Sequence, residues 1–158
     1  MTALTVAESW VQAPFRRFID DARLRSAVLL LSSGRVLAQF GFSRADEVMS
    51  ICALASAINA SSRELGRQLD GKPFGELHHS GGERQLYMGQ CQAGGREYIF
   101  VGIFDAESSV GVVETYFSDF ARALEESWQS AARADGAPTA DFEGDLNRSL
   151  DALFGPLE

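Results

Sequence analysis

The chain has 158 residues, of which 46% are hydrophobic and 23% are charged, and its formal net charge is −8. This size and composition are typical of one globular domain that buries a core without metals or disulfides. The negative charge and the lack of a basic cluster exclude nucleic acid as an expected partner. No apolar run reaches the roughly 18 residues of a membrane-spanning helix, so we expect no membrane insertion.

The first residues, MTALTVAESWVQ, include the acidic Glu8 and no basic residue ahead of an apolar stretch, which is unlike a secretion signal. We therefore expect a cytoplasmic protein, with residues 1–12 as an N-terminal extension. In that compartment the two cysteines, Cys52 and Cys91, are expected to be reduced, buried thiols.

Apolar residues at helical spacing predict a short opening helix with Pro14 in its first turn. Two β-rich runs, SAVLLL and VLAQFGF, surround a glycine-containing turn at 32–35 and predict a hairpin. Three more strands are expected over 74–79, 84–92 and 97–104, because pairs of glycines separate them.

Between the hairpin and these three strands, residues 48–62 form an uncharged stretch with helical spacing. Ser43 and Asp46 resemble a weak capping box that would start the helix, and Gly71 would end it. One side of a helical wheel collects the residues expected in the core: Val48, Ile51, Ala55, Ile58, Ser62, Leu65 and Leu69. The opposite side collects small residues where a solvated helix carries Lys and Glu: Ala53, Ser56, Ala57, Ala60 and then Glu64. This side is either a protein-binding surface or is buried between two layers of the same domain.

A second long helix is expected after Ser108 and Ser109, and it is an internal control. Its apolar residues share one side: Val113, Phe117, Phe120, Leu124 and Trp128. Its other side is polar, from Thr115 to Gln129. The same chain therefore places polar residues on a helix face that is expected to be solvated. The small residues of the first helix depart from this and indicate a different role for that face.

Residues 131–141 have the composition of a linker, and residues 142–158 predict an acidic, amphipathic tail helix. Its apolar residues are candidates for contacts: Phe142, Leu146, Leu150, Leu153 and Phe154. An isolated helix of this length is marginal in water, so it is expected to dock on its own domain or on a partner.

The order helix, hairpin, helix, meander, helix predicts an α+β fold with a five-stranded antiparallel sheet and flanking helices. Enzyme chemistry is not expected. His78 and His79 are adjacent in a strand, so their side chains point to opposite faces and do not share a metal. The glycines form no nucleotide-binding motif, so we expect no catalytic residue, metal or cofactor.

Several segments resemble the roadblock family over about residues 14–128. They are the turn in LLLSSGRVLA, the small-residue helix that ends at LDG, the segment GERQLYM, and IFDAESSVGVV before the last helix. The terminal DLNRSLDALFG is similar to the tail of bacterial members that regulate MglA-like, Ras-related small GTPases.

The resemblance implies a roadblock domain over 13–130 that forms a homodimer through the small-residue helix and the strand after it. It implies that the paired helices bind one GTPase and accelerate GTP hydrolysis without an inserted catalytic residue. Ala60 and Glu64 would face the GTPase, and Ala57 and Ser61 would border them. The tail would promote nucleotide exchange.

The residues leave other readings open. Arg63 and Arg67 are either catalytic fingers or surface charges, and we favour surface charges that pair with Glu64. The chain is alternatively an adaptor dimer that changes no GTPase rate. A third reading is a small-molecule sensor of the PAS or GAF kind, which would require an enclosed apolar cavity.

Overall fold

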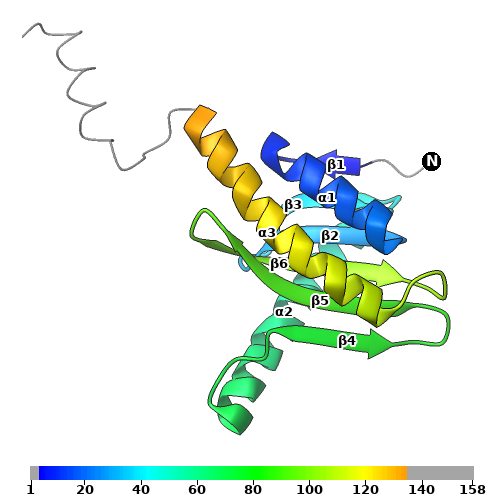
Figure 1. Ribbon diagram of the computed structural model, residues 1–158. Coiled ribbons are helices and arrows are strands. Elements are labelled where there is room, and N and C mark those ends of the chain that lie inside the picture. Colours follow the sequence, from blue (N-terminus) through cyan, green and yellow to red (C-terminus); the bar gives the residue numbers. More distant parts are fainter. Residues whose placement is uncertain (1–3, 135–158) are drawn as a thin grey trace, which may run out of the picture.

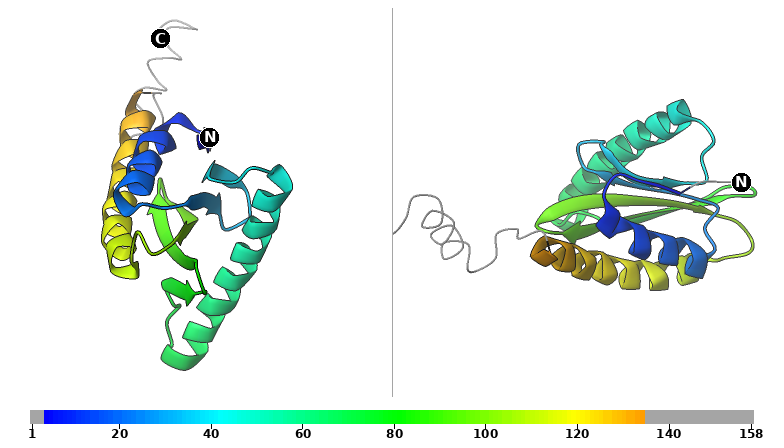
Figure 2. Two further views of the ribbon diagram at one scale, coloured as in Figure 1. Left: turned by 90° about the vertical axis from the view of Figure 1, so that its right-hand side faces the viewer. Right: turned by 90° about the horizontal axis from the view of Figure 1, so that it is seen from above.

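The computed structural model describes residues 4–134, which form one antiparallel sheet between two helical layers (Figure 1). The elements are β1 (Leu4–Val6), α1 (Ser9–Ala22), β2 (Ser26–Leu31), β3 (Val36–Phe40), α2 (Ala45–Asp70), β4 (Glu76–Ser80), β5 (Gln85–Ala93), β6 (Arg96–Phe104) and α3 (Val110–Ala134). The sheet order is β1-β3-β2-β6-β5-β4. Figure 2 shows α1 and α3 on one face of the sheet and α2 alone on the other. The predicted α+β fold is confirmed.

The sheet has six strands rather than the predicted five. The additional strand, β1, lies within the predicted N-terminal extension and pairs with β3, where Leu4 is opposite Phe40 and Val6 is opposite Ala38. A strand of three residues is too short to show a periodic pattern. It forms because the outer edge of β3 offers unpaired backbone groups.

Helix α1 begins at Ser9, earlier than predicted, so Pro14 lies inside the helix and not in its first turn. Proline has no N–H, which leaves the carbonyl of Trp10, four residues earlier, without its helical donor. The Ser127 hydroxyl of α3 donates to this carbonyl at 2.5 Å. The proline is therefore tolerated, and the freed carbonyl links α1 to α3.

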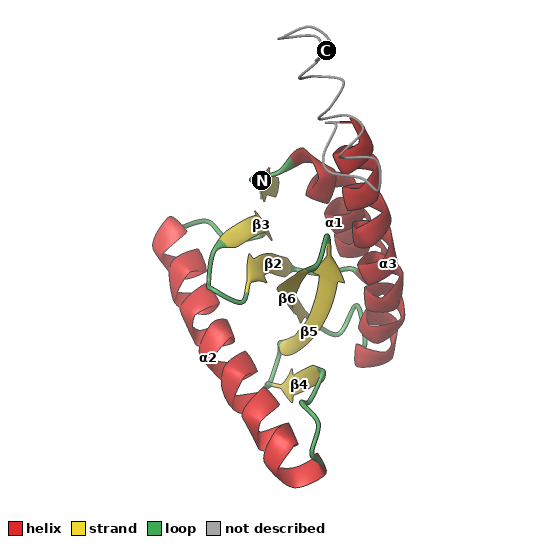
Figure 3. Ribbon diagram, turned by 90° about the vertical axis from the view of Figure 1, so that its left-hand side faces the viewer, coloured by secondary structure: helices red, strands yellow, loops and turns green. Residues whose placement is uncertain are grey.

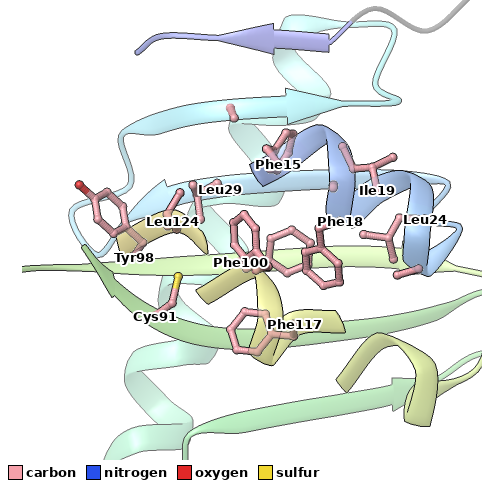
Figure 4. Close-up of a cluster of buried hydrophobic side chains, with 14 of the residues drawn as sticks. Phe15, Phe18, Ile19, Leu24, Leu29, Cys91, Tyr98, Phe100, Phe117 and Leu124 are labelled. Carbon is pink, nitrogen blue, oxygen red and sulfur yellow. The ribbon is translucent and has the colours of Figure 1, made fainter. Parts of the chain in front are cut away.

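The main core lies between the sheet and the layer of α1 and α3 (Figure 4). It is rich in phenylalanine: the ring of Phe18 lies 4.7 Å from that of Phe100 and 5.1 Å from that of Phe120. The α3 prediction is confirmed, since Phe117, Phe120 and Leu124 are buried and the opposite side is polar and exposed. The Ser109 hydroxyl caps α3 by accepting from the N–H of Val112 at 3.3 Å.

A smaller core lies between the sheet and α2, and the two cysteines are divided between the two cores. Cys52 of α2 belongs to the smaller core, and Cys91 of β5 belongs to the main core. Both are unpaired and buried, at 2% and 6% exposure, as predicted. Burial raises the pKa of Cys91 to about 12, because a thiolate is costly away from water.

The β5–β6 turn contains two adjacent glycines, of which only Gly94 lies against Trp128. We therefore expect an alanine to destabilise the fold more at Gly94 than at Gly95. Gly94 and Gly95 both have left-handed backbones, with φ of 60° and 76°. A Cβ on Gly94 would overlap the indole of Trp128, whereas a Cβ on Gly95 would meet nothing within 4 Å. We expect Gly94→Ala to lower the free energy of unfolding by about 2 to 4 kcal/mol, and Gly95→Ala by about 1 kcal/mol. Urea unfolding measures both, and equal losses would contradict the contact with Trp128.

Candidate protein-interaction site

Helix α2 is the element that carries the candidate site, and it spans 26 residues. The predicted capping box is wrong: Arg44, not Ser43, is at the N-cap, without a side-chain cap, and its guanidinium pairs with Asp46 at 2.6 Å. The predicted end is confirmed, because Gly71 has φ of 73° and its N–H donates to the Arg67 carbonyl at 3.0 Å.

The side of α2 that packs on the sheet agrees only in part with the side predicted from the helical wheel. The buried residues are Val48, Cys52, Ala55, Asn59 and Gly66. Most of these residues are small, so the helix lies close to the rest of the chain. A Cβ on Gly66 would lie only 2.5 Å from the backbone nitrogen of Phe74.

The predicted core positions Ile58, Leu65 and Leu69 are exposed, at 39%, 52% and 68%. Val48 and Ala55 are buried as predicted, and Ile51 and Ser62 are half-buried. The prediction is therefore wrong for the three large residues. The pattern did not distinguish a face that packs on the chain's own sheet from one that is free in the monomer.

An exposed row of large apolar side chains runs along one flank of α2. This apolar flank consists of Leu54, Ile58, Leu65 and Leu69. Ile58 and Leu65 line an open groove of about 370 Å³ together with Leu77 and His79 of β4. Strand β4 is the last strand of the sheet, so no strand from the described part of the chain lies beside its outer edge (Figure 3). Exposed apolar side chains gathered beside the edge of a sheet make this flank a candidate surface for contact with another protein.

A second outward surface of α2 is built from small residues. This small face consists of Ala53, Ala57, Ala60, Ser61 and Glu64, all of which are exposed. The predicted member Ser56 is half-buried, and its hydroxyl is buried without a hydrogen-bond partner within the described part of the chain. Within residues 4–134 the other five residues are exposed, so no second layer of the described domain covers this face.

The charged residues near the small face have partners. Gln68 and Arg67 donate to the Glu64 carboxylate at 3.3 Å and 3.1 Å, and these hydrogen bonds lower its pKa. The small face therefore carries one negative charge at neutral pH. The expected pairing of Arg67 with Glu64 is confirmed, whereas the interpretation of Arg63 as a surface charge is wrong. Arg63 turns to the sheet and lies 3.3 Å from Glu97 of β6.

The two histidines lie on opposite faces of β4, as predicted. His78 is 2.8 Å from the Gln85 side chain and stacks on Phe104, which belongs to the main core. His79 lines the groove beside α2. Within residues 4–134 no three His, Cys, Asp or Glu side chains gather in a way that would hold a metal ion.

Two other predictions concern membranes and the tail. None of α1, α2 and α3, the helices of the part that the structure describes, combines the length and apolarity needed to cross a bilayer. The predicted tail contacts lie outside the described residues: Phe142, Leu146, Leu150, Leu153 and Phe154.

Comparison with solved structures decides the fold. MglB from Myxococcus xanthus superposes with a TM-score of 0.68, at 22% identity, over 78% of this chain and 98% of MglB. A roadblock/LC7 domain from Streptomyces avermitilis superposes with a TM-score of 0.63, at 18% identity, over 75% of this chain and 95% of that domain. The chain has the roadblock fold.

The roadblock fold is also that of an MglB structure with a tetrameric arrangement, at a TM-score of 0.65 and 21% identity, over 82% of this chain and 97% of the other. No family model matches the sequence, and no curated protein matches it. In this roadblock fold, α2 is the helix that stands alone on its face of the sheet, and it carries both the apolar flank and the small face.

Proposed function

We propose that the chain is a cytoplasmic, non-catalytic regulator that acts as a homodimer and accelerates GTP hydrolysis by an MglA-like, Ras-related small GTPase. The observation that carries this proposal is the presence of two adjoining outward surfaces on α2, one with large apolar side chains and one with small side chains, within a fold shared with MglB proteins. A fold hosts many functions, so the argument rests on these surfaces rather than on the fold.

The apolar flank is proposed to bind a second copy of the chain. Ile58 and Leu65 are exposed, lie beside Leu77, and would leave water when a copy related by a twofold axis covers them. The outer edge of β4 has free backbone groups that pair with the same edge of the other copy. The structure with a tetrameric arrangement supports self-association in a protein of this fold.

The small face is proposed to bind the GTPase. Alanine and serine side chains allow a partner backbone to approach α2 closely, which long side chains would prevent. The ion pair of Glu64 and Arg67 adds a polar group at the border of this face, which favours a partner with a complementary polar group.

Stimulation without an inserted arginine is proposed because Arg63 is turned to the sheet and Arg67 forms a surface ion pair along α2 itself. Arg63 is paired with Glu97, and Arg67 is paired with Glu64. An arginine finger must reach the phosphates of the nucleotide. The regulator would instead favour the GTPase conformation in which the GTPase's own groups contact the γ-phosphate and the attacking water.

The tail over 142–158 is proposed to contact a separate site on the GTPase and to promote nucleotide exchange. Its amphipathic pattern supports a contact with another surface. The sensor alternative would require an enclosed apolar cavity, whereas both cores of the described residues are filled by packed side chains.

The deciding experiment measures single-turnover GTP hydrolysis by an MglA-like GTPase with and without this protein. We expect the rate to rise at least about tenfold, a lower limit well below the increases that activators with an arginine finger provide. Binding without acceleration would favour the adaptor dimer. The ion pairs of Arg63 with Glu97 and of Arg67 with Glu64 support that alternative, because both arginines are paired within the chain. Absence of binding would contradict both functions.

A further inference from the structure

The two halves of α2 are held on the sheet by different kinds of contact. In the first half, Val48, Cys52 and Ala55 pack against apolar residues of β2, β5 and β6. After Ala55 no apolar side chain of α2 belongs to this core, and the inward positions are taken by Asn59 and Gly66. The second half, which runs past β4 in Figure 3, therefore adds no buried apolar side chain to this core, and its exposed Ile58 and Leu65 only border Leu77 of β4.

A chain of polar side chains holds this second half. The Arg63 guanidinium donates to the Gln90 side-chain oxygen on β5 and lies 3.3 Å from the Glu97 carboxylate on β6. The Gln90 amide donates to the Asn59 side-chain oxygen at 2.5 Å. We name these four residues, Asn59, Arg63, Gln90 and Glu97, the polar latch.

The polar latch is shielded from solvent more than the other ion pairs of the described residues. The Arg63 and Glu97 side chains are 24% and 31% exposed, compared with 69% and 61% for the pair of Arg122 and Asp119 on α3. Salt and water weaken a shielded pair less than an exposed pair. Removal of one member leaves a half-buried polar group without its partner, which costs more than the loss of a surface pair.

We propose that the polar latch positions the second half of α2 on the sheet and thereby sets the arrangement of both outward surfaces. Apolar contacts tolerate sliding and rotation, whereas hydrogen bonds are directional and define one register. Residues 59–70 include Ala60, Ser61 and Glu64 of the small face and Leu65 and Leu69 of the apolar flank. The consequence for a partner rests on the proposed function, but the positioning of the helix does not.

Hydrogen exchange of the full-length chain tests the latch directly. Gln90→Met keeps the length of the side chain and removes both of its hydrogen bonds, and Glu97→Gln removes the charge opposite Arg63. We expect amides of residues 59–70 to exchange about tenfold faster or more in Gln90→Met, with a smaller increase in Glu97→Gln. Amides of residues 46–55 should keep the wild-type rates, because their apolar contacts remain.

The control is Asp119→Asn, which removes the exposed pair on α3 and should leave exchange in α2 unchanged. The close approach of Gly66 to Phe74 is present in every variant, so it does not account for a difference between them. Unchanged exchange over 59–70 in Gln90→Met would overturn the proposal. An equal increase over 46–55 and the sheet would also overturn it, because the whole domain would then be destabilised.

GTP hydrolysis with the same variants tests the consequence for the partner. We expect Gln90→Met to lower stimulation by several-fold, far less than the roughly thousandfold loss that removal of an arginine finger causes. Faster exchange with full stimulation would overturn the link between the latch and the partner. If the wild-type protein stimulates no GTPase, the proposed function fails, and the exchange data still decide whether the latch positions the helix.

Discussion

Replacement of Ala60 by arginine is expected to abolish stimulation of the GTPase and to leave the fold intact. Ala60 is an exposed member of the small face and contributes to neither core. A long charged side chain there would hold a closely packed partner away from α2. We expect a loss of about 2 kcal/mol or more in binding, which is at least about thirtyfold in affinity. Titration of the GTPase and single-turnover hydrolysis measure the loss.

The matched control for Ala60→Arg is Ser118→Arg, which puts the same side chain on the exposed, polar side of α3. Both variants should melt within about 2 °C of the wild-type protein, because surface substitutions away from special contacts change stability little. Only Ala60→Arg should lose stimulation. Full activity of Ala60→Arg would contradict the assignment of the small face, and a large fall in its melting temperature would contradict the exposed position of Ala60.

Replacement of Leu65 by glutamate is expected to convert the homodimer to a monomer. Leu65 is 52% exposed in the isolated chain and lines the groove beside Leu77. In the proposed dimer this position leaves water, and an unpaired carboxylate there costs several kcal/mol. We expect dimer affinity to fall about a hundredfold or more. Sedimentation equilibrium should show the mass fall from twice 17.2 kDa to 17.2 kDa.

Val112→Glu is the control for the dimer, since Val112 is an exposed apolar residue on α3, in the opposite helical layer. This variant should remain a dimer. A wild-type protein that is monomeric at micromolar concentration, or a Leu65→Glu variant that is still dimeric, would contradict the role of the apolar flank. A monomeric Leu65→Glu variant that keeps full stimulation would separate dimer formation from activation.

Local patterns predict most of the elements, because their signals lie within a few residues. The hairpin of β2 and β3, the three strands from β4 to β6, and the buried side of α3 all agree with the structure. Strand β1 does not have such a signal, since it exists only through its pairing with β3. The position of Pro14 inside α1 was also not predictable, because the compensating donor, Ser127, is far away in sequence.

The orientation of α2 shows where hydropathy stops being informative. A helical wheel ranks Ile58 and Leu65 above Cys52 and Asn59 as core residues, yet the sheet contacts Cys52 and Asn59. An apolar residue gives the same signal whether it is covered by its own sheet or by another molecule. The buried Asn59 is stabilised by a hydrogen bond from the Gln90 side chain. Gln90 is distant in sequence, so this contact produces no periodic pattern from which it could be predicted.

The small face was predictable for a different reason. A cluster of small residues without Lys lies on α2 where the exposed side of α3, in the same chain, carries polar and charged residues. The prediction placed six residues on this surface, and five of them are exposed in the structure, whereas Ser56 is half-buried. The residue pattern does not specify the function of that surface, and the measurement of GTP hydrolysis is needed to establish it.

The placement of the two cysteines makes the chain suitable for labelling experiments. Cys52 and Cys91 are the only thiols of the sequence and are both buried, and burial keeps them in the unreactive, protonated form. A single cysteine introduced at Ala60 or Leu65 would therefore be the one accessible thiol, without removal of the native pair. The rate at which a thiol reagent modifies each introduced cysteine, with and without the partner, would report on coverage of the small face and of the apolar flank.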